Sequence, residues 1–317
     1  MKSRGIIMGV DTSNYTTSVA LMYSDGELIA NIKEPLPVKL GECGLRQSDA
    51  VFSHIKNLPK AMERATQALA GERVCAIGVS ERPRNVSGSY MPCFLAGLSA
   101  ATSAAASSAV PLYKFSHQCG HIMAAVYSSK AYRVLESPFL AFHLSGGTTE
   151  LVRAMKSEEG FSCEIVGGTL DINAGQLIDR VGVAMGLSFP CGKELEALAL
   201  AYDADVRIEK IAQKGAFLNL SGLENKAKAL LGVGKTKEYT ARYVLESIAS
   251  AVASVCRTVT LENTETPIVF AGGVMSNSII KAHLSAEFNA YFAEPALSSD
   301  NAVGTAELAR LKFISKQ

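Results

Sequence analysis

The chain has 317 residues, of which 48% are hydrophobic and 19% are charged. A chain of this size and composition can form about two folded domains, which excludes an intrinsically disordered protein. With 31 basic and 30 acidic residues the net charge is +1, which argues against a protein whose whole surface binds nucleic acid. The seven cysteines are scattered and form no C-x-x-C pair, so we expect reduced thiols in a cytoplasmic protein.

The first predicted elements are a hairpin and a third strand. Residues 6–10 form an apolar run that Asp11 ends. The run is shorter than the apolar core of a secretory signal, about 7–15 residues, so we expect a strand here and no signal. A second strand is predicted over 16–21, and Asp25-Gly26 predicts a turn into a strand from Leu28.

A helix, a short strand and an uncharged stretch follow. Apolar residues spaced near 3.6 predict a helix over 54–69 with Ile55 on its buried face, and residues 74–79 predict a buried strand. Residues 85–113 contain no Asp, Glu, Lys or Arg and are long enough to span a bilayer. Because 96–110 is mostly Ala and Ser, we interpret it as a helix packed tightly inside the protein and expect no membrane contact.

The pattern of the first hairpin recurs after about 130 residues, one domain length. A strand at 139–144, a Gly/Ser/Thr loop and a strand at 150–154 repeat its order. Alternating strands and helices then indicate an α/β protein, with a strand at 267–270 and helices at 178–185, 194–201, 239–262, 277–288 and 302–313. Two related hairpins predict two duplicated lobes that face a ligand cleft. A chance likeness of two glycine turns is the alternative.

Two of the five histidines, His117 and His121, stand four residues apart. On a helix these positions share a face, so both imidazoles can bind one metal ion. A pair of ordinary surface or core histidines is the alternative. The peptidase signature H-E-x-x-H is absent, because Gln118 occupies the position of its general-base Glu. Asp300 precedes the last helix, where it is either a helix cap or a carboxylate ligand for the same ion.

Two glycine loops are candidates for anion binding. Residues 145–149 follow a buried strand, where bare backbone N–H groups can hold a phosphate or carboxylate. Residues 271–277 join a strand to a helix, a place suited to nucleotide phosphates, although the G-x-G-x-x-G spacing is absent. A ligand-free hairpin and a packing turn are the alternatives. Between Arg207 and Arg242, eight basic residues against three acidic ones offer a contact for phosphates or a solvated face.

Taken together and in order, these segments resemble the TsaD/YgjD family, the tRNA threonylcarbamoyladenosine synthases once called glycoproteases. The likeness covers almost the whole chain. The matching segments are G-V-D-T-S at 9–13, the histidines His117 and His121, L-S-G-G at 144–147, A-G-x-x-x-D ending at Asp179, P-C-G at 190–192, L-S-G-L at 220–223, G-G-V-x-x-N ending at Asn277, and D-N at 300–301.

The resemblance implies a fold and a domain organisation. The family has the two-lobed actin-like/sugar-kinase (ASKHA) fold, in which a duplicated RNase H-like core encloses an interlobe ligand cleft. We therefore expect an N-terminal lobe over 1–115 and a C-terminal lobe over 116–300. The C-terminal helix, 301–317, is expected to pack back on the first lobe.

The resemblance also implies an activity. Family members move the threonylcarbamoyl group of threonylcarbamoyl-adenylate to the N6 amine of the adenosine beside the tRNA anticodon. By match, Asp11 is catalytic, and one divalent ion, iron or zinc, binds His117, His121 and Asp300. The partners implied are tRNA, a homologous TsaB-like protein and a TsaE-like ATPase. The residues expected to bind the adenylate are Leu144, Ser145, Gly146, Gly147, Asp179, Gly192, Glu196 and Asn277.

Several positions at the rim of the cleft depart from the family pattern. The family's early acidic pair is replaced by Tyr15 and Thr16. Its G-P-G loop appears as Arg82-Pro83-Arg84, which loses two glycines and their easy access to positive φ. Cys119 replaces a Glu, and Thr148 replaces a His or Asn. The alternatives to a synthase-like transferase are a non-catalytic partner of the same fold, a metallopeptidase and a kinase.

Overall fold

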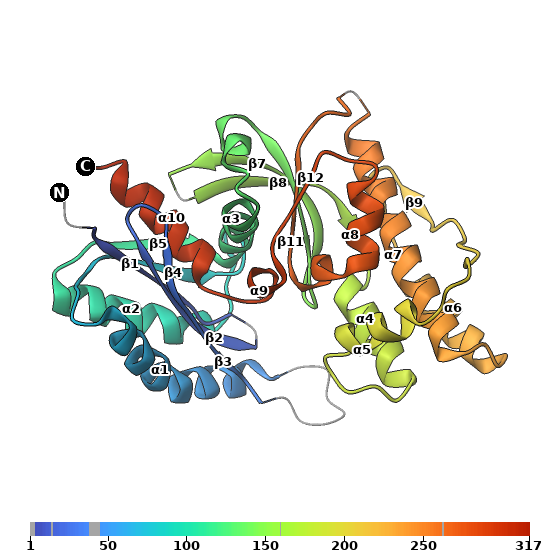
Figure 1. Ribbon diagram of the computed structural model, residues 1–317, viewed down its shortest axis with the longest axis horizontal. Helices are drawn as coiled ribbons and strands as arrows, with labels where there is room; N and C mark the ends of the chain where they lie inside the picture. Colours follow the sequence, from blue (N-terminus) through green and yellow to red (C-terminus); the bar gives the residue numbers. More distant parts are fainter. Residues whose placement is uncertain (1–3, 14, 38–44, 159, 262) are drawn as a thin grey trace.

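The first of two sheets in the computed structural model has five strands (Figure 1). The structure describes residues 4–13, 15–37, 45–158, 160–261 and 263–317. Strands β1, β2 and β3 are antiparallel neighbours, and β4 and β5 run parallel to β1, in the order β3-β2-β1-β4-β5. The strands are β1 (Ile6–Asp11), β2 (Thr16–Tyr23), β3 (Leu28–Pro35), β4 (Val74–Arg82) and β5 (Leu112–Ser116).

The second sheet repeats this order. Strands β6, β7 and β8 form an antiparallel meander, and β11 and β12 run parallel to β6 on its other side. The series β8-β7-β6-β11-β12 therefore corresponds to β3-β2-β1-β4-β5, and the predicted duplicated core is confirmed. A short pair of strands extends the β8 edge. The strands are β6 (Phe139–Leu144), β7 (Thr149–Ser157), β8 (Gly160–Thr169), β9 (Gln213–Lys214), β10 (Phe217–Leu218), β11 (Ile268–Ala271) and β12 (Ala290–Phe292).

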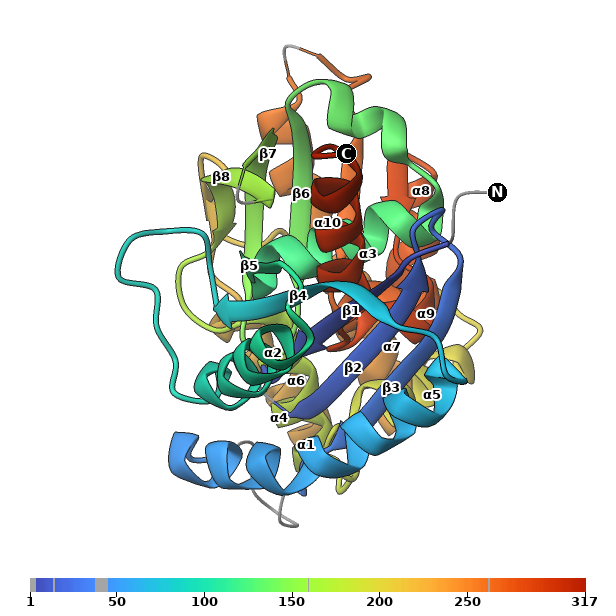
Figure 2. The same cartoon turned by 90° about the vertical axis from the view of Figure 1, so that its left-hand side faces the viewer.

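Helices cover the sheets on their outer sides (Figures 1 and 2). Along β1, alternate side chains face opposite cores, so Ile6 packs with α1 and α2 whereas Ile7 packs with α3 and α10. Helices α4 to α8 belong to the second half of the molecule, where α7 packs on β8. These outer helices are α1 (Gln47–Leu69), α2 (Phe94–Ser108), α4 (Ala174–Ala184), α5 (Gly192–Leu200), α6 (Ser221–Gly232), α7 (Lys237–Val259) and α8 (Ser278–Ser285).

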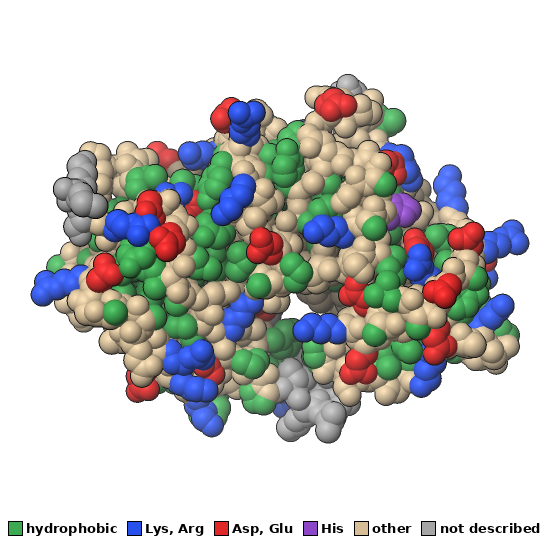
Figure 3. Space-filling model, in the orientation of Figure 1, with side chains coloured by type: hydrophobic (Ala, Val, Ile, Leu, Met, Phe, Trp, Pro, Cys, Tyr) green, Lys and Arg blue, Asp and Glu red, His purple; other side chains and the backbone are tan. Residues whose placement is uncertain are grey.

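The two halves meet at α3 (His117–Ser129) and α10 (Val303–Ile314), each of which follows the last strand of its sheet. A Cβ at Gly304 would lie 1.8 Å from the Gly120 carbonyl oxygen, so the helices touch backbone to backbone. Helix α10 also packs on β1 and β4 of the first sheet. The surface is hollowed between the halves (Figure 3), as the two-lobed fold predicts. The lobe boundaries at residues 115 and 300 stay a prediction.

Helix α1 differs from its prediction in its start and in part of its buried face. It begins at Gln47 instead of residue 54. It buries His54, and the Ile55 side chain, predicted to be inside, is 55% exposed. The cause is a hydrogen bond of 2.8 Å between His54 Nδ1 and Thr17 Oγ1, which gives one nitrogen of the buried ring a partner on the sheet.

Helix α2 is less enclosed than we expected. Its buried residues form one face, and Leu95 on the other is 48% exposed. On the buried face a Cβ at Gly97 would lie 2.7 Å from Thr12 Oγ1, so the small residue permits the close contact. Within the described ranges, no helix combines the length and apolarity needed to cross a membrane.

Three smaller differences concern helix ends and thiols. Helix α4 begins at Ala174, which places Asp179 in its second turn and not at its start. Helix α7 ends at Val259, and the predicted end at Glu262 lies outside the described residues. The cysteines that the structure describes are free thiols, and Cys43 lies outside the described residues.

Two short 3-10 turns and one short helix complete the chain as described. They are η1 (Tyr132–Glu136), which leads into β6, η2 (Gly273–Ser276), which leads into α8, and α9 (Pro295–Ser298), which precedes α10. The connection from α9 to α10 matters most for the site, because it contains Asp300.

Candidate functional site

Two histidines and a carboxylate converge where α3 and α10 meet. His117 is the first residue of α3, and His121 follows one turn later on the same face. Asp300 Oδ1 lies 3.6 Å from His117 Nε2 and 3.3 Å from His121 Nε2. Donor atoms of all three residues lie within 4.8 Å of one another. The sequence-predicted trio is therefore brought together, and Asp300 does not cap α10, whose N-cap is Ala302.

The loop after β1 fixes the other side of the His117 ring. Asp11 Oδ2 lies 3.0 Å from His117 Nδ1, and Asp11 Oδ1 accepts a hydrogen bond of 2.9 Å from the Ser13 N–H. Residues 11–13 are fully buried. A hydrogen bond of this kind orients an imidazole and leaves its second nitrogen for a ligand. Asp11 therefore contacts His117 and not the centre of the trio, and its catalytic role stays a prediction.

The charges of the site favour a cation at this point. Burial disfavours a charged imidazole, but the carboxylates of Asp11 and Asp300 outweigh it and raise the pKa of His117 to about 10. Burial also opposes ionisation of Asp300, yet the neighbouring His117 and His121 hold the pKa of this carboxyl well below its usual value. Burial and the neighbouring His117 lower the pKa of His121. Two carboxylates thus stabilise positive charge between them.

The donor set fits a divalent transition-metal ion. Two imidazoles and a carboxylate are ligands that both iron and zinc accept in proteins. His121 Nε2 is buried and makes no hydrogen bond, although Asp300 Oδ1 lies 3.3 Å away. Their lone pairs are therefore free for a shared ion, which makes this trio a candidate metal site.

The loop after β6 occupies the place in the second sheet that residues 11–13 occupy in the first. Gly146 and Gly147 are exposed, and a Cβ added at either would meet no atom within 4 Å. On its inner side the loop rests on α4, where a Cβ at Gly175 would lie 2.7 Å from Gly146 N. The loop is held by the start of α4 and presents bare backbone outward, as an anion site requires.

Two other predicted adenylate residues meet at the start of α8. Asn277 is its N-cap and accepts hydrogen bonds of 3.1 Å from two N–H groups of the first turn. Glu196 Oε1, from α5, accepts the Ser278 N–H at 2.7 Å. Both side chains stabilise the helix start, where a phosphate would also be stabilised.

Asp179 of α4 lies beside the start of α5, whose first residue is Gly192. Asp179 Oδ1 accepts a hydrogen bond of 2.8 Å from the N–H of Cys191, the residue before Gly192, and burial raises the pKa of Asp179. Leu144 is fully buried at the end of β6, and its carbonyl oxygen would lie 2.2 Å from a Cβ at Gly272. The adenylate role of these residues stays a prediction.

The altered loop Arg82-Pro83-Arg84 joins the two halves. Arg84 makes an ion pair of 2.8 Å with Glu150 of β7, and Asn85 Nδ2 donates to the Phe161 carbonyl oxygen at 2.7 Å. Burial raises the pKa of Glu150, and the Arg84 charge opposes this effect. Side-chain contacts thus occupy the rim position at which the family pattern has bare glycines.

Sequence reasoning missed one residue of the site, His143. It lies on β6, its ring centroid is 4.5 Å from that of His121, and both its ring nitrogens are buried without a hydrogen-bond partner. Burial, with the two neighbouring histidines, lowers its pKa well below the ordinary value. A lone histidine inside an otherwise apolar strand, Phe139–Leu144, was the signal that could have identified it.

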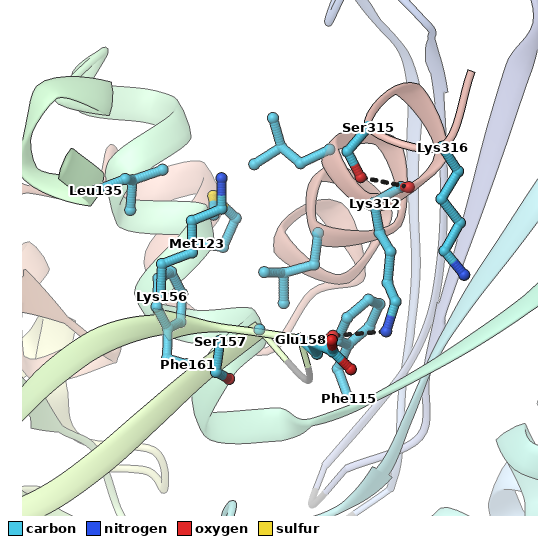
Figure 4. Close-up of a pocket in the computed structure, with 13 residues that line it drawn as sticks. Phe115, Met123, Leu135, Lys156, Ser157, Glu158, Phe161, Lys312, Ser315 and Lys316 are labelled. Carbon is cyan, nitrogen blue, oxygen red and sulfur yellow. Dashed lines mark hydrogen bonds between the residues drawn. The ribbon is translucent and has the colours of Figure 1, made fainter.

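A cavity of about 370 Å³ lies apart from these residues, between the β7–β8 hairpin and the C-terminal part of α10 (Figure 4). Phe161, Met123 and Leu135 contribute apolar side chains, and Lys156 and Lys312 stand on either side (Figure 4). None of the predicted site residues lines it. The cavity therefore adds nothing to the predicted site.

The basic stretch between Arg207 and Arg242 is partly neutralised. Ion pairs engage Lys226 with Glu209 at 2.8 Å, Lys228 with Glu224 at 2.6 Å, and Arg242 with Glu246 at 2.8 Å. Paired surface charges attract phosphates less than unpaired ones. Contact of this stretch with tRNA stays a prediction.

Solved structures similar to the chain share its architecture. HypF in its phosphate- and nucleotide-bound form aligns with a TM-score of 0.62 and 12% identity, over 100% of this chain and 48% of that one. Component A of the (R)-2-hydroxyglutaryl-CoA dehydratase of Acidaminococcus fermentans gives 0.58 and 13% over 98% and 99%. A ROK family glucokinase from Streptomyces griseus gives 0.53 and 12% over 97% and 100%. These likenesses show the actin-like/sugar-kinase fold.

Sequence relatives show the family. The family model for TsaD, tRNA N6-adenosine threonylcarbamoyltransferase, matches residues 42–307. Proteins with that name from Streptococcus pneumoniae (strain CGSP14) and Streptococcus suis (strain 05ZYH33) are 31% and 29% identical, over 90% of this chain and 85% of theirs. These matches and the fold define a transferase built on two related lobes. The chain belongs to the TsaD family.

Proposed function

We propose that this protein transfers the threonylcarbamoyl group of threonylcarbamoyl-adenylate to the N6 amine of the adenosine beside the tRNA anticodon. The observation that carries the proposal is the convergence of His117, His121 and Asp300 within 4.8 Å at the junction of the lobes, in a chain of this family. Relatives named tRNA N6-adenosine threonylcarbamoyltransferase match 90% of the chain, which supports transfer of this group to a tRNA adenosine.

The reaction exchanges one bond for another. The adenosine amine attacks the carbamoyl carbon, the bond from that carbon to the phosphate oxygen breaks, and AMP leaves with the electron pair while the amine loses a proton to solvent. A divalent ion, iron or zinc, when bound by His117, His121 and Asp300 supplies Lewis-acid stabilisation of negative charge. Asp11 keeps the His117 ring oriented through its 3.0 Å contact.

The second lobe binds the adenylate in this proposal. The exposed backbone of Gly146 and Gly147 receives the phosphate, because no Cβ blocks the approach of an anion; the Gly147 N–H then exchanges its 3.3 Å hydrogen bond with Ser145 Oγ for the phosphate. Asp179 and Glu196 each use one carboxylate oxygen for a backbone N–H, which leaves the second oxygen for a ribose hydroxyl. Asn277 holds the start of α8 beside them.

Reconstitution tests the proposal. The chain replaces the usual family member in a reaction with tRNA, threonine, bicarbonate, ATP and the other synthase components, and modified adenosine is measured together with bound metal. We expect product from the wild type, and loss of both product and metal in His121→Ala and Asp300→Ala. His283→Ala is the matched control, because His283 lies on α8 near Glu246, outside the trio. A metal-loaded protein without product would contradict the proposal.

The second candidate is a non-catalytic partner of the same fold, favoured by the Arg84–Glu150 pair at the rim. The same reaction separates the two candidates, since a scaffold would form no product but would raise the product yield of an authentic family member. A metallopeptidase would instead cleave protein in a metal-dependent way. We also propose that the protein is cytoplasmic and acts with a TsaB-like homologue and a TsaE-like ATPase. Co-purification would reveal these two partners.

A further inference from the structure

His143 is placed on the face of β6 that packs against α3. Side chains alternate along this strand, so Phe139 and Ala141 belong to the core beneath α3 and α10, whereas the residues between them belong to the core of the second lobe. His143 continues the first series, and its ring packs on His121 with the centroids 4.5 Å apart. The fold therefore directs a polar ring to a candidate metal ligand.

The surroundings of His143 leave its polarity unsatisfied. The residue is 4% exposed, and neither ring nitrogen has a hydrogen-bond partner. Unpaired buried polar groups are rare because they lose their hydrogen bonds with water. Room for the ring depends on Gly272, where a Cβ would lie 2.8 Å from His143 Cδ2. A buried imidazole that lacks a hydrogen-bond partner within the protein points to a bound molecule that supplies this hydrogen bond.

Distances distinguish direct binding of a metal ion by His143 from a hydrogen bond between His143 and an atom bound to that ion. Ligand atoms lie about 2.0–2.3 Å from their ion, so two ligands of one ion are at most about 4.6 Å apart. Asp300 Oδ1 lies 3.6 Å and 3.3 Å from the two histidine nitrogens, within this limit, and all three donors lie within 4.8 Å of one another in a group that does not include His143. A hydrogen bond to an atom that is itself bound to the ion extends the reach by about 2.7–3.2 Å.

We propose that His143 hydrogen-bonds an oxygen ligand of the metal ion, which is water in the resting protein and a substrate oxygen during transfer. The inference rests on the proposed metal site of His117, His121 and Asp300. It makes His143 a residue that touches substrate and not a fourth metal ligand. Strand β6 would then carry His143 near its end and lead directly into the predicted phosphate loop, which begins at Ser145.

Cobalt(II) provides the test, because its visible absorption reports on both the ion and its ligands. Wild type, His143→Leu and His143→Gln are loaded with Co²⁺, and the cobalt affinity is measured by chelator competition. Formate, an oxygen-donor anion, is then titrated. We expect unchanged cobalt affinity in all three proteins and formate binding about tenfold weaker in His143→Leu, since one hydrogen bond to a charged ligand is lost. Gln, whose amide N–H can donate, restores part of the affinity.

Controls separate this inference from the metal site itself. His283→Leu, outside the site, changes neither affinity, and His121→Ala abolishes cobalt binding. Equal formate affinity in wild type and His143→Leu overturns the inference alone. Cobalt affinity that falls in His143→Leu as far as in His121→Ala shows direct ligation and overturns it as well. Wild type that binds no Co²⁺ overturns the metal site of the proposed function together with it.

Discussion

The loops after β1 and β6 stand at corresponding places in the two sheets, yet their environments are opposite. Residues 11–13 are fully buried, and Asp11 reaches His117 at 3.0 Å. Gly146 and Gly147 are exposed, with open space where side chains would be. One copy of the hairpin thus places a buried carboxylate against His117 of the proposed cation site, while the other exposes the backbone of the proposed anion site. The two hairpins have the same arrangement of strands, and the difference between the two proposed sites comes from the residues in their loops.

We expect the largest effect on stability from the contact between the Asp11 carboxylate and the His117 imidazolium. In metal-free protein, the free energy of unfolding should fall as pH rises from 6.5 to about 10, because the pKa of His117 is raised from 6.5 to about 10 in the folded state. The stabilisation is complete below 6.5 and is lost as the imidazolium deprotonates. Urea unfolding with a chelator at several pH values measures it. His117→Gln should flatten the profile in this range, and an unaltered profile would contradict the assignment.

Asp11→Asn weakens the support of His117 without changing the shape of the side chain. We expect metal affinity to fall about 10–100-fold, the usual loss when a partner of a histidine ligand is removed. Chelator competition with Zn²⁺ or Fe²⁺ measures this. Ser145→Ala, in the corresponding loop of the second lobe, is the matched control and should bind metal like the wild type. Equal affinity of both variants would remove the distinction between the loops.

Gly175→Ala tests the contact that holds the second loop. A Cβ there would lie 2.7 Å from backbone atoms of Ser145 and Gly146, so we expect the free energy of unfolding to fall by about 1–3 kcal/mol. Urea unfolding provides the measurement. Gly146→Ala adds the same methyl on the open side and should stay within about 0.5 kcal/mol of wild type. Similar losses in the two variants would contradict the described packing.

Gly147→Ala tests the open side of the same loop. The methyl group meets no protein atom but occupies the space proposed for the phosphate. We expect AMP to bind about tenfold more weakly, or about 1.4 kcal/mol, with unchanged thermal stability. Calorimetric titration with AMP measures the effect. Gly222→Ala on α6, also free of contacts within 4 Å, serves as control and should leave AMP binding intact.

The smallest effect is expected at the rim. Arg84→Ala removes the 2.8 Å ion pair with Glu150, and Arg84 is 41% exposed, so the stability loss should be about 0.2–1 kcal/mol. The difference from wild type should shrink at high salt, because screening weakens exposed pairs. A loss that is large and independent of salt would show that the pair is more than a surface contact.

Local patterns predicted the fold well, and contacts distant in sequence explain the failures. Asp25-Gly26 encodes its turn within two residues, and the alternating strands encode the duplicated sheets. On the buried face of α1, Leu58 and Ala65 were predicted correctly, and Ile55 was wrong because His54 turns inward to Thr17, a partner on strand β2. His143 was missed for a related reason, since only the fold brings it to His121.

The backbone contact between Gly120 and Gly304 has a consequence for motion. Gly120 lies between His117 and His121 in the chain, and Gly304 follows Asp300 by four residues, so the three proposed metal ligands adjoin the place where the lobes touch. Atoms near a pivot travel least when two bodies rotate about it. A rotation of the lobes about this contact would preserve the proposed metal site, while the glycine loop beyond the end of β6 would move farther.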